Sequence, residues 1–257
     1  MFIIQNQKFT IYFGDAEQSI SLDEIEKKEK TSALAHIEQE LKLKQVVFLK
    51  QEHGILGKVI DLHDHQNYFF DPVGDYLITQ KKDCGIGVVT ADCLPIVIYD
   101  SVTQTAAIIH AGWKGLVAGI FEKTILELIT LLRQGFEGQN AKHFEIYLGP
   151  AARPCCYEVQ QDFVELFCET SAEALAQAGQ EQFREYQKYS HEFFIQRDGK
   201  TYFDSRSFIV VIARNLGIAD EKLYTRYNLC TICNLSFCSY RREQTQARRQ
   251  VTMICLH

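Results

Sequence analysis

The pattern of apolar and polar positions divides the chain into a charged first segment and a longer region of short apolar runs. Residues 20–43 are rich in Glu and Lys, and their apolar positions recur at roughly helical spacing, which predicts one or two surface helices. These positions are Ile25, Leu34, Ile37 and Leu41. Beyond residue 44, short apolar runs bounded by polar residues indicate buried strands. They are QVVFL at 45–49, YLIT at 76–79 and GIGVVT at 85–90.

Residues 96–110 have the pattern of a β-hairpin, with the apolar runs 96–99 and 105–110 on either side of a polar turn. If Asp100 pairs with Thr105, Pro95 lies opposite His110, and Cys93 lies just past the open end. Strand spacing then places Cys93 within about 10 Å of His110. Because Pro95 cannot donate a ladder hydrogen bond, we expect regular pairing to end there.

The second half of the chain adds segments whose apolar residues fall on one helical face. A stripe of this kind follows Gly115 and consists of Val117, Phe121, Ile125, Leu128 and Leu132. Further helices are predicted over residues 159–178 and 208–216, and strands over 144–148 and 250–256. Because strands and helices alternate without a regular βαβ order, the pattern predicts a mixed α+β fold.

Composition and charge narrow the classes of function. The chain has 257 residues with a formal net charge of −6, so we expect neither nucleic acid nor an anionic membrane as a partner. The first residues, MFIIQNQKFTIYFGD, are too polar for a signal peptide, and no apolar run reaches the roughly 18 residues of a membrane span. We therefore expect a cytoplasmic protein whose 9 cysteines are reduced.

Three residues of metal-binding type stand at the ends of predicted strands: His53, Cys93 and His110. Imidazole nitrogen and thiolate sulfur are good zinc ligands, and three protein ligands leave a fourth position open, as in catalytic zinc sites. The alternative interpretation is a surface histidine and a buried structural cysteine. Asp92, beside Cys93, is a candidate general base or ligand-orienting residue, or else a carboxylate that caps a strand end.

The segment after His110 is a candidate anion-binding turn. Gly112 and Gly115 flank Trp113 and Lys114 just before the predicted helix. Small residues at this point let backbone N–H groups face a phosphate or carboxylate, and Lys114 adds positive charge. The alternative is a tight turn in which Trp113 packs into the core.

Arginines near the C-terminal end of the sequence are a second candidate for phosphate binding. They are Arg241, Arg242, Arg248 and Arg249. The net acidity of the chain and the lack of interleaved aromatic residues argue against a nucleic-acid site. We expect one or two of these side chains, Arg241 among them, to bind substrate phosphate or to pair with acidic neighbours.

Two further clusters contain metal-binding residue types. The stretch DLHDH at 61–65 is interpreted as a polar loop rather than a metal site. The pair Cys230-x-x-Cys233, together with Cys238, matches the pattern of structural zinc sites, although no fourth ligand lies near it in the sequence. This pattern supports a non-enzymatic alternative, a structural zinc-binding module. Cys155 and Cys156 are expected to pack in the core.

Four segments carry a resemblance to a known family: ADCLP at 91–95, HAGWKG at 110–115, GPAARPCCYEV at 149–159 and CTICNLSFCSYRRE at 230–243. In this order they resemble the multicopper polyphenol oxidase (laccase) domain family. That family includes the bacterial YlmD and YfiH proteins and the laccase domain-containing purine nucleoside phosphorylases. The resemblance extends from about residue 51 to residue 257.

The resemblance implies that His53, Cys93 and His110 hold Zn²⁺, because they match the family's Q-x-H-G, A-D-C and H-A-G-W motifs. It implies a YfiH-like fold over residues 1–257, a single α+β domain with mixed β-sheets sandwiched between helical layers. It also implies phosphorolysis of purine nucleosides to free base and ribose 1-phosphate, with adenosine, inosine, guanosine and methylthioadenosine as substrates. Adenosine deamination is a further implied activity. The partners are then a purine nucleoside and phosphate; the sequence defines no oligomeric state.

Other functions attached to the family remain alternatives, namely editing of peptidoglycan precursors and copper-dependent oxidation of polyphenols. Only 8 histidines are present, few for the several copper ions of a multicopper oxidase, so zinc is favoured over copper. The chain also departs from the family pattern. Residues 1–44 lack its R-x-G-G-V-S segment, which puts an arginine of the phosphate or substrate site in doubt, and Ala247 replaces the glycine of its T-G-R motif.

Overall fold

The strands of the computed structural model, which describes residues 1–133, 141–169 and 188–257, form three sheets. The first has the order β1-β2-β16-β8-β4-β6, with β3 also paired to β16. Its strands are β1 (Phe2–Gln5), β2 (Phe9–Phe13), β3 (Ser19–Ile20), β4 (Gln45–Lys50), β6 (Tyr68–Val73), β8 (Cys84–Thr90) and β16 (Arg249–Leu256). We call it the seven-stranded sheet.

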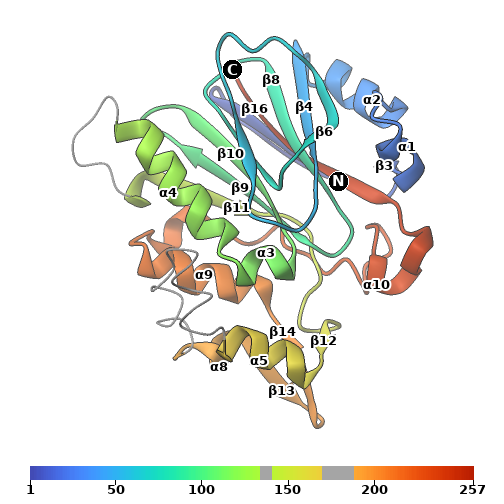
Figure 1. Ribbon diagram of the computed structural model, residues 1–257, viewed down its shortest axis with the longest axis vertical. Helices are drawn as coiled ribbons and strands as arrows, with labels where there is room; N and C mark the ends of the chain where they lie inside the picture. The colour runs from blue at the N-terminus through green and yellow to red at the C-terminus, as the bar shows by residue number, and fades with distance from the viewer. Residues whose placement is uncertain (134–140, 170–187) are drawn as a thin grey trace.

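The second sheet has the order β15-β11-β9-β10-β7-β5, and we call it the six-stranded sheet. Its strands are β5 (Gly57–Ile60), β7 (Tyr76–Thr79), β9 (Leu94–Asp100), β10 (Thr105–Ala111), β11 (Phe144–Leu148) and β15 (Leu223–Tyr224). A small third sheet, of order β12-β14-β13, lies at one end of the molecule (Figure 1). It consists of β12 (Glu158–Val159), β13 (Phe194–Arg197) and β14 (Lys200–Phe203).

The two large sheets pack against each other because their strands are apolar on both faces. Along β10, Ala106 and Ile108 contribute to the core between the sheets, whereas Ala107 and Ile109 contribute to a second core under the helices. Side chains alternate between the faces of a strand, so a strand covered on both sides must be apolar throughout. Every residue of β8, β9 and β10 is accordingly buried.

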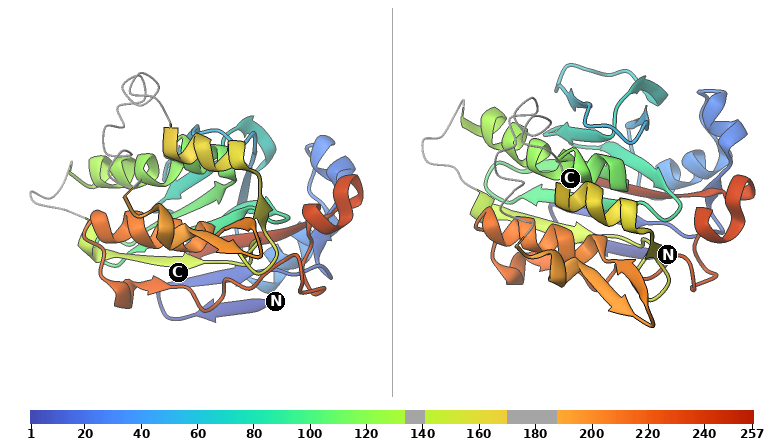
Figure 2. Two further views of the ribbon diagram at one scale, coloured as in Figure 1. Left: turned by 90° about the horizontal axis from the view of Figure 1, so that it is seen from below. Right: turned by 60° about the horizontal axis from the view of Figure 1, so that its bottom comes forward.

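Helices cover the outer face of each large sheet, so the layers run helix, sheet, sheet, helix (Figures 1 and 2). Two short N-terminal helices lie on the seven-stranded sheet, and Leu34 and Ile37 of the second helix pack into the core there. These are α1 (Leu22–Glu26) and α2 (Ser32–Glu40). The helices on the side of the six-stranded sheet are α3 (Trp113–Val117), α4 (Ile120–Arg133), α5 (Gln161–Glu169), α8 (Ser190–Phe193) and α9 (Ser205–Asn215). A last helix, α10 (Tyr240–Glu243), precedes β16.

The α+β class with sheets between helical layers is confirmed, and so is the hairpin register. Asp100 pairs with Thr105 and Pro95 with His110. We predicted that regular pairing would end at Pro95, but it continues to Leu94. Cys93 is therefore the first residue outside the strand. The predicted strands at 45–49, 76–79, 85–90, 144–148 and 250–256 and the helix at 208–216 are present.

Three expectations change. The helix predicted after Gly115 is two helices, because Gly119 adopts a positive φ of 77° between α3 and α4. The helix predicted over 159–178 begins at Gln161, and its part beyond residue 169 lies outside the described residues. The N-terminal strand β2 was not predicted. Its residues are all buried because it pairs with β16 from the other end of the chain.

No helix in the described part of the chain is long and apolar enough to cross a membrane.

Glu122 on α4 provides a test of the packing around the helix. It is 7% exposed, and within the described residues its Oε2 has no hydrogen-bond partner. Burial raises the pKa of Glu122 from 4.5 to about 7. Folding thus favours the protonated form, so its contribution to stability is present below about pH 4.5 and is lost as the pH rises to 7.

At about 1.36 kcal/mol per pKa unit, the loss is about 3 kcal/mol. We expect Glu122→Gln to raise the free energy of unfolding at pH 8 and to flatten its decline between pH 5 and 8. Denaturant titrations across this range measure the effect. The exposed Glu165 supplies the control, Glu165→Gln, which leaves the pH profile unchanged. Equal profiles for Glu122→Gln and the wild type would contradict the prediction.

Candidate metal centre

The structure brings together the three predicted ligands at one end of the two large sheets. His53 follows β4 of the seven-stranded sheet, Cys93 lies between β8 and β9 where the chain passes from one sheet to the other, and His110 lies on β10. Their ligand atoms all lie within 4.8 Å of one another, and Cys93 Sγ is 3.6 Å from His53 Nε2. Two imidazoles and one thiol at this spacing fit a single metal ion.

A buried carboxylate that the sequence analysis did not identify holds two of these residues. Asp75 is 1% exposed and precedes β7. Its Oδ1 accepts hydrogen bonds from His110 Nδ1 at 2.8 Å and from the His53 backbone N–H at 3.0 Å. Its Oδ2 accepts from the Gly54 N–H at 2.8 Å. With Nδ1 engaged, Nε2 is the nitrogen of His110 left to bind a metal, which is the arrangement of carboxylate–histidine–metal sites.

The loop that carries His53 is also attached to the seven-stranded sheet by a side chain. Gln51 Oε1 accepts from the Val89 N–H at 2.8 Å, and Gln51 Nε2 donates to the Val89 carbonyl at 2.7 Å. The side-chain amide of Gln51 thus forms hydrogen bonds with β8 of the kind that a backbone group of β4 would form. His53 then adopts a left-handed conformation with φ 61°, and its ring meets that of His110 edge to face at 4.8 Å.

Gly112 is required by close packing against the ligands. A Cβ atom at this position would lie 2.5 Å from His53 Cδ2 and 3.3 Å from Cys93 Sγ. Its backbone, at φ −72° and ψ 159°, is open to any residue, so the constraint is steric rather than conformational. At Gly115 a Cβ would lie 3.1 Å from the Gly54 carbonyl oxygen.

The electrostatics of the centre favour the metal-binding form of the cysteine. Burial opposes ionisation of Cys93, but the neighbouring His110 and His53 lower the pKa of its thiol to about 6. Burial likewise opposes protonation of His110, but Cys93 and Asp75 raise its pKa to about 9. The thiolate is the form of cysteine that coordinates metals.

The centre opens into a cavity of about 560 Å³, a size typical of small-molecule sites. Five aromatic side chains line it: Phe70, Trp113, Tyr157, Phe203 and Tyr240. Leu22, Ile25 and Glu26 of α1 also line it, so the N-terminal segment that departs from the family pattern forms part of the wall. The predicted ligands therefore share one cavity with large apolar surfaces.

Two arginines bring positive charge to this cavity. Arg241 and Arg249 both line it. Arg241 donates to the Glu158 carbonyl and lies over the ring of Tyr157, and Arg249 donates to the carbonyls of Ala247 and Arg248. Among the residues that the structure describes, neither guanidinium is paired with a carboxylate. Their charges remain available to an anion.

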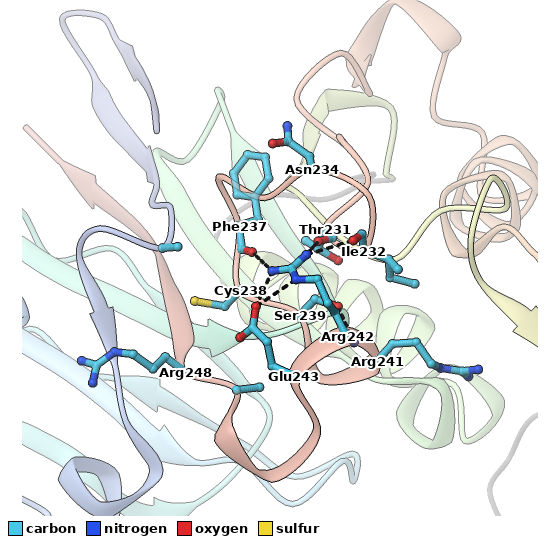
Figure 3. A network of polar contacts seen from close by, with 12 residues as sticks. Thr231, Ile232, Asn234, Phe237, Cys238, Ser239, Arg241, Arg242, Glu243 and Arg248 are labelled. Atoms are coloured by element: carbon cyan, nitrogen blue, oxygen red, sulfur yellow. Dashed lines mark hydrogen bonds and ion pairs between the residues drawn. The ribbon is translucent and has the colours of Figure 1, made fainter.

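The other two arginines have different roles. Arg242 donates to the backbone carbonyls of Thr231, Ile232 and Phe237 and so ties the loop before α10 together (Figure 3). Arg248 points away on the far side of this network and binds Ser19 and Glu24. The sequence identified the basic group, but only the structure separates the two arginines that face the cavity from the two that hold the fold.

Asp92 lines the cavity, and its carboxylate accepts three hydrogen bonds from the segment before β16. Oδ1 accepts from Thr231 Oγ1 at 2.6 Å, and Oδ2 accepts from Ser239 Oγ at 3.1 Å and the Arg241 N–H at 2.6 Å. The Asp92 backbone has a positive φ of 87°, a conformation that aspartate tolerates better than most residues. The contacts fix the backbone next to Cys93 and orient Arg241.

The predicted anion-binding turn lies at the start of α3, and its role in anion binding stays a prediction. Lys114 is exposed, with its ammonium group 5.6 Å from the centre of the Trp113 ring, and it is absent from the cavity lining, as are Gly112 and Gly115. Trp113 itself does line the cavity. The stretch 61–65 has no helix or strand and is a loop. Asp75 carried no signal in the sequence beyond its place before an apolar run, whereas Gln51 begins the Q-x-H-G motif, although its bonds to Val89 were not predicted.

The role of Asp75 leads to a first prediction for the centre. Asp75→Asn keeps the shape of the side chain but removes the charge that orients His110. We expect the affinity for a divalent metal to fall about 10- to 100-fold, measured by competition with a chromophoric chelator. Asp220→Asn, which breaks only an exposed pair with Arg214, is the control. An unchanged affinity in Asp75→Asn would show that the carboxylate does not support metal binding.

The packing at Gly112 leads to a second prediction. The methyl group of Gly112→Ala would overlap His53, so we expect a folded protein that loses most of its bound metal. Gly54→Ala is the matched control, because its Cβ would meet only Asp75 Oδ2 at an ordinary 3.6 Å. Metal analysis with circular dichroism of both variants tests this. Equal metal contents would mean that His53 is not held where the structure places it.

Comparison with known proteins identifies similar sequences. A purine nucleoside phosphorylase of Clostridium acetobutylicum is 29% identical over 252 residues, covering 97% of this chain and 93% of that protein. One of Borreliella burgdorferi is 35% identical over 202 residues, covering 77% and 75%. Adenosine deaminase RL5, of unknown prokaryotic origin, is 33% identical over 131 residues, covering 49% and 47%.

Solved structures share the fold. YlmD from Geobacillus stearothermophilus matches with a TM-score of 0.72 and 20% identity, covering 97% of this chain and 91% of that one. Neisseria meningitidis protein NMB0706 matches with a TM-score of 0.70 and 21% identity, covering 99% and 98%. Residues 21–257 match the family model described as multi-copper polyphenol oxidoreductase laccase. The chain therefore belongs to the multi-copper polyphenol oxidoreductase laccase family.

Proposed function

We propose that this chain is a zinc-dependent purine nucleoside phosphorylase that converts adenosine, inosine, guanosine or methylthioadenosine to the free base and the 1-phosphate of its sugar. The observation that carries the proposal is the pairing of two features in one cavity. The His53–Cys93–His110 group lines it, and so do the guanidinium groups of Arg241 and Arg249, which have no carboxylate partner among the described residues. The names of the relatives from Clostridium acetobutylicum and Borreliella burgdorferi support this activity.

The chemistry of the ligand group supports zinc rather than copper. Two imidazoles and one thiolate form a set of borderline ligands that suits zinc, and the side facing the cavity is left open. A zinc ion in such a site supplies a Lewis acid that polarises an oxygen of a bound molecule. His53, Cys93 and His110 would hold it, with Asp75 fixing the tautomer of His110.

The arginines account for phosphate binding. A guanidinium presents a planar set of donors that matches phosphate oxygens, and Arg241 and Arg249 provide two of them. Arg241 and Arg249 provide the positive charge that the arginine of the missing N-terminal R-x-G-G-V-S segment would otherwise provide. In phosphorolysis a phosphate oxygen forms a bond to the anomeric carbon as the bond to the base nitrogen breaks. The bonding electrons leave with the base, which takes up a proton.

The aromatic residues account for the purine. A flat heterocycle stacks on aromatic rings, and the cavity offers Trp113, Tyr157 and Tyr240 beside the charged groups. Water must be kept from the anomeric carbon, because it would otherwise compete with phosphate as the nucleophile. The buried apolar residues Phe70, Leu94 and Leu116 in the wall serve this purpose.

Asp92 acts in this proposal as a positioning residue. Its two oxygens accept three hydrogen bonds, so they are committed to Thr231, Ser239 and the backbone of Arg241. A general base needs a free oxygen near the proton that it takes. The geometry therefore favours the orienting role over the general-base role that the sequence also allowed.

Adenosine deamination is the second candidate, supported by the similarity to adenosine deaminase RL5 over about half of each chain. It requires water rather than phosphate as the nucleophile, and it releases ammonia. In this proposal adenosine binds in the same cavity for either reaction. The two activities then differ in the co-substrate, water or phosphate, and in the products rather than in the site.

The test is an assay of the purified protein with adenosine, with and without phosphate. We expect adenine and ribose 1-phosphate only when phosphate is present, and we expect Cys93→Ala to lose both metal and activity. Arg241→Ala should raise the KM for phosphate about 10- to 100-fold, since a hydrogen bond to a charged group contributes about 1.5–3 kcal/mol. Arg214→Ala, on the outer face of α9, is the control.

The products discriminate the alternatives. Inosine and ammonia formed without phosphate would replace phosphorolysis by deamination. Turnover of no nucleoside would overturn the proposal and leave the peptidoglycan-precursor and polyphenol substrates to be tested on the same preparation.

A further inference from the structure

A second group of metal-binding side chains lies outside the cavity. Cys155 and Cys156 follow β11, and Cys230 and Cys233 precede α10. Their four sulfur atoms lie within 4.8 Å of one another, and Cys155 Sγ is 3.9 Å from Cys233 Sγ. All four are free thiols. None of them lines the cavity, and the proposed phosphorolysis does not use them.

We propose that these four cysteines bind one zinc ion in a closed tetrahedral site that stabilises the wall of the cavity. Tetrahedral coordination with Zn–S bonds of about 2.3 Å separates the sulfur atoms by about 3.8 Å. The separation of Cys155 and Cys233 has this value to within about 0.1 Å. Four thiolates and no open position are typical of structural rather than catalytic zinc.

The backbone brings the two cysteine pairs together independently of any metal. Ala151 and Cys230 form an isolated β-bridge, in which the Ala151 N–H donates to the Leu229 carbonyl and the Thr231 N–H donates to the Ala151 carbonyl, both at 3.0 Å. Arg153 adds hydrogen bonds from Nη1 to Asn228. The sequence positions 155 and 230, distant along the chain, are thus held side by side before coordination.

The loop between Cys230 and Cys233 is also fixed in shape. Arg242 holds the carbonyls of Thr231 and Ile232 at 2.7 and 2.9 Å, as Figure 3 shows. The Asn234 N–H donates to the Cys230 carbonyl. A preformed loop loses little conformational entropy when an ion binds, which favours affinity.

The Cys230-x-x-Cys233 pair, predicted as part of a structural zinc site, keeps this role in the proposal but with different partner residues. Cys238 does not join it, because its side chain is 2% exposed and packs with Ala91 and Ala247. Cys155 and Cys156, expected in the core, supply the two ligands that the sequence lacked: Cys155 is exposed and Cys156 is half-buried. The site joins the segment that carries Tyr157 to the segment that carries Arg241, and both residues line the cavity.

Metal analysis of matched variants tests the inference. We expect about two zinc ions per wild-type chain, about one in Cys233→Ser and about one in Cys93→Ala. Cys238→Ala, a cysteine outside both groups, should keep two. If Cys233→Ser retains as much zinc as the wild type, or Cys93→Ala retains none, the four-cysteine site is disproved. If Cys93→Ala retains both ions, the four-cysteine site stands and the ligand assignment at the first centre is wrong.

A second measurement leaves the four cysteines intact, because Cys233→Ser could unfold. Cobalt takes tetrahedral thiolate sites in place of zinc, and each thiolate ligand adds intense charge-transfer absorption. Cobalt-loaded Cys93→Ala should keep about four fifths of the wild-type absorption, since four of the five thiolates remain. Loss of the bands would disprove the site. Titration of all 9 thiols in unfolded, unreduced, chelator-treated protein should find nine free; seven or fewer would indicate disulfides instead.

Discussion

The carboxylate of Asp75 is the contact on which the geometry of the metal centre depends. Asp75 lies at the start of a strand of the six-stranded sheet, and the loop that carries His53 leaves a strand of the seven-stranded sheet. One side chain therefore joins the two sheets and orients two ligands: it accepts from His110 Nδ1 and from the N–H groups of residues 52–54. A buried carboxylate is tolerated only when its oxygens are satisfied, so the fold and the centre require each other.

The third ligand, Cys93, is positioned by the course of the backbone between the two sheets. Cys93 lies in the connection that runs from β8 of one sheet to β9 of the other, and Asp92 fixes that connection through its hydrogen bonds to Thr231 and Arg241. Rigid elements thus hold all three ligands before any ion binds. The close approach at Gly112 follows from the same constraint, since the His53 ring and the start of α3 compete for one space.

The sequence predicted the features that depend on residues close together along the chain. The register of the hairpin follows from two apolar runs and a short turn, so the proximity of Cys93 and His110 could be derived from spacing. His53 was a candidate because it follows a predicted strand, but nothing local relates it to a hairpin 40 residues away, so its assignment as a ligand depended mainly on the family resemblance. Asp75 could not be found from pattern, since a single acidic residue before an apolar run is common. The pairing of β2 with β16 was missed for a related reason, as its partner lies at the other end of the chain.

The two cysteine-containing groups have contrasting chemistry, and two neighbouring residues connect them. Cys230 precedes Thr231, whose hydroxyl donates to Asp92, and Asp92 precedes Cys93. A second hydrogen bond, from the Ala152 N–H to the Asp92 carbonyl at 2.9 Å, joins the segment before Cys155 to the same residue. The open group must admit substrate and so cannot be closed by a fourth protein ligand. In the proposed arrangement, a closed thiolate site on the adjoining segment holds the wall of the cavity in place without occupying the cavity.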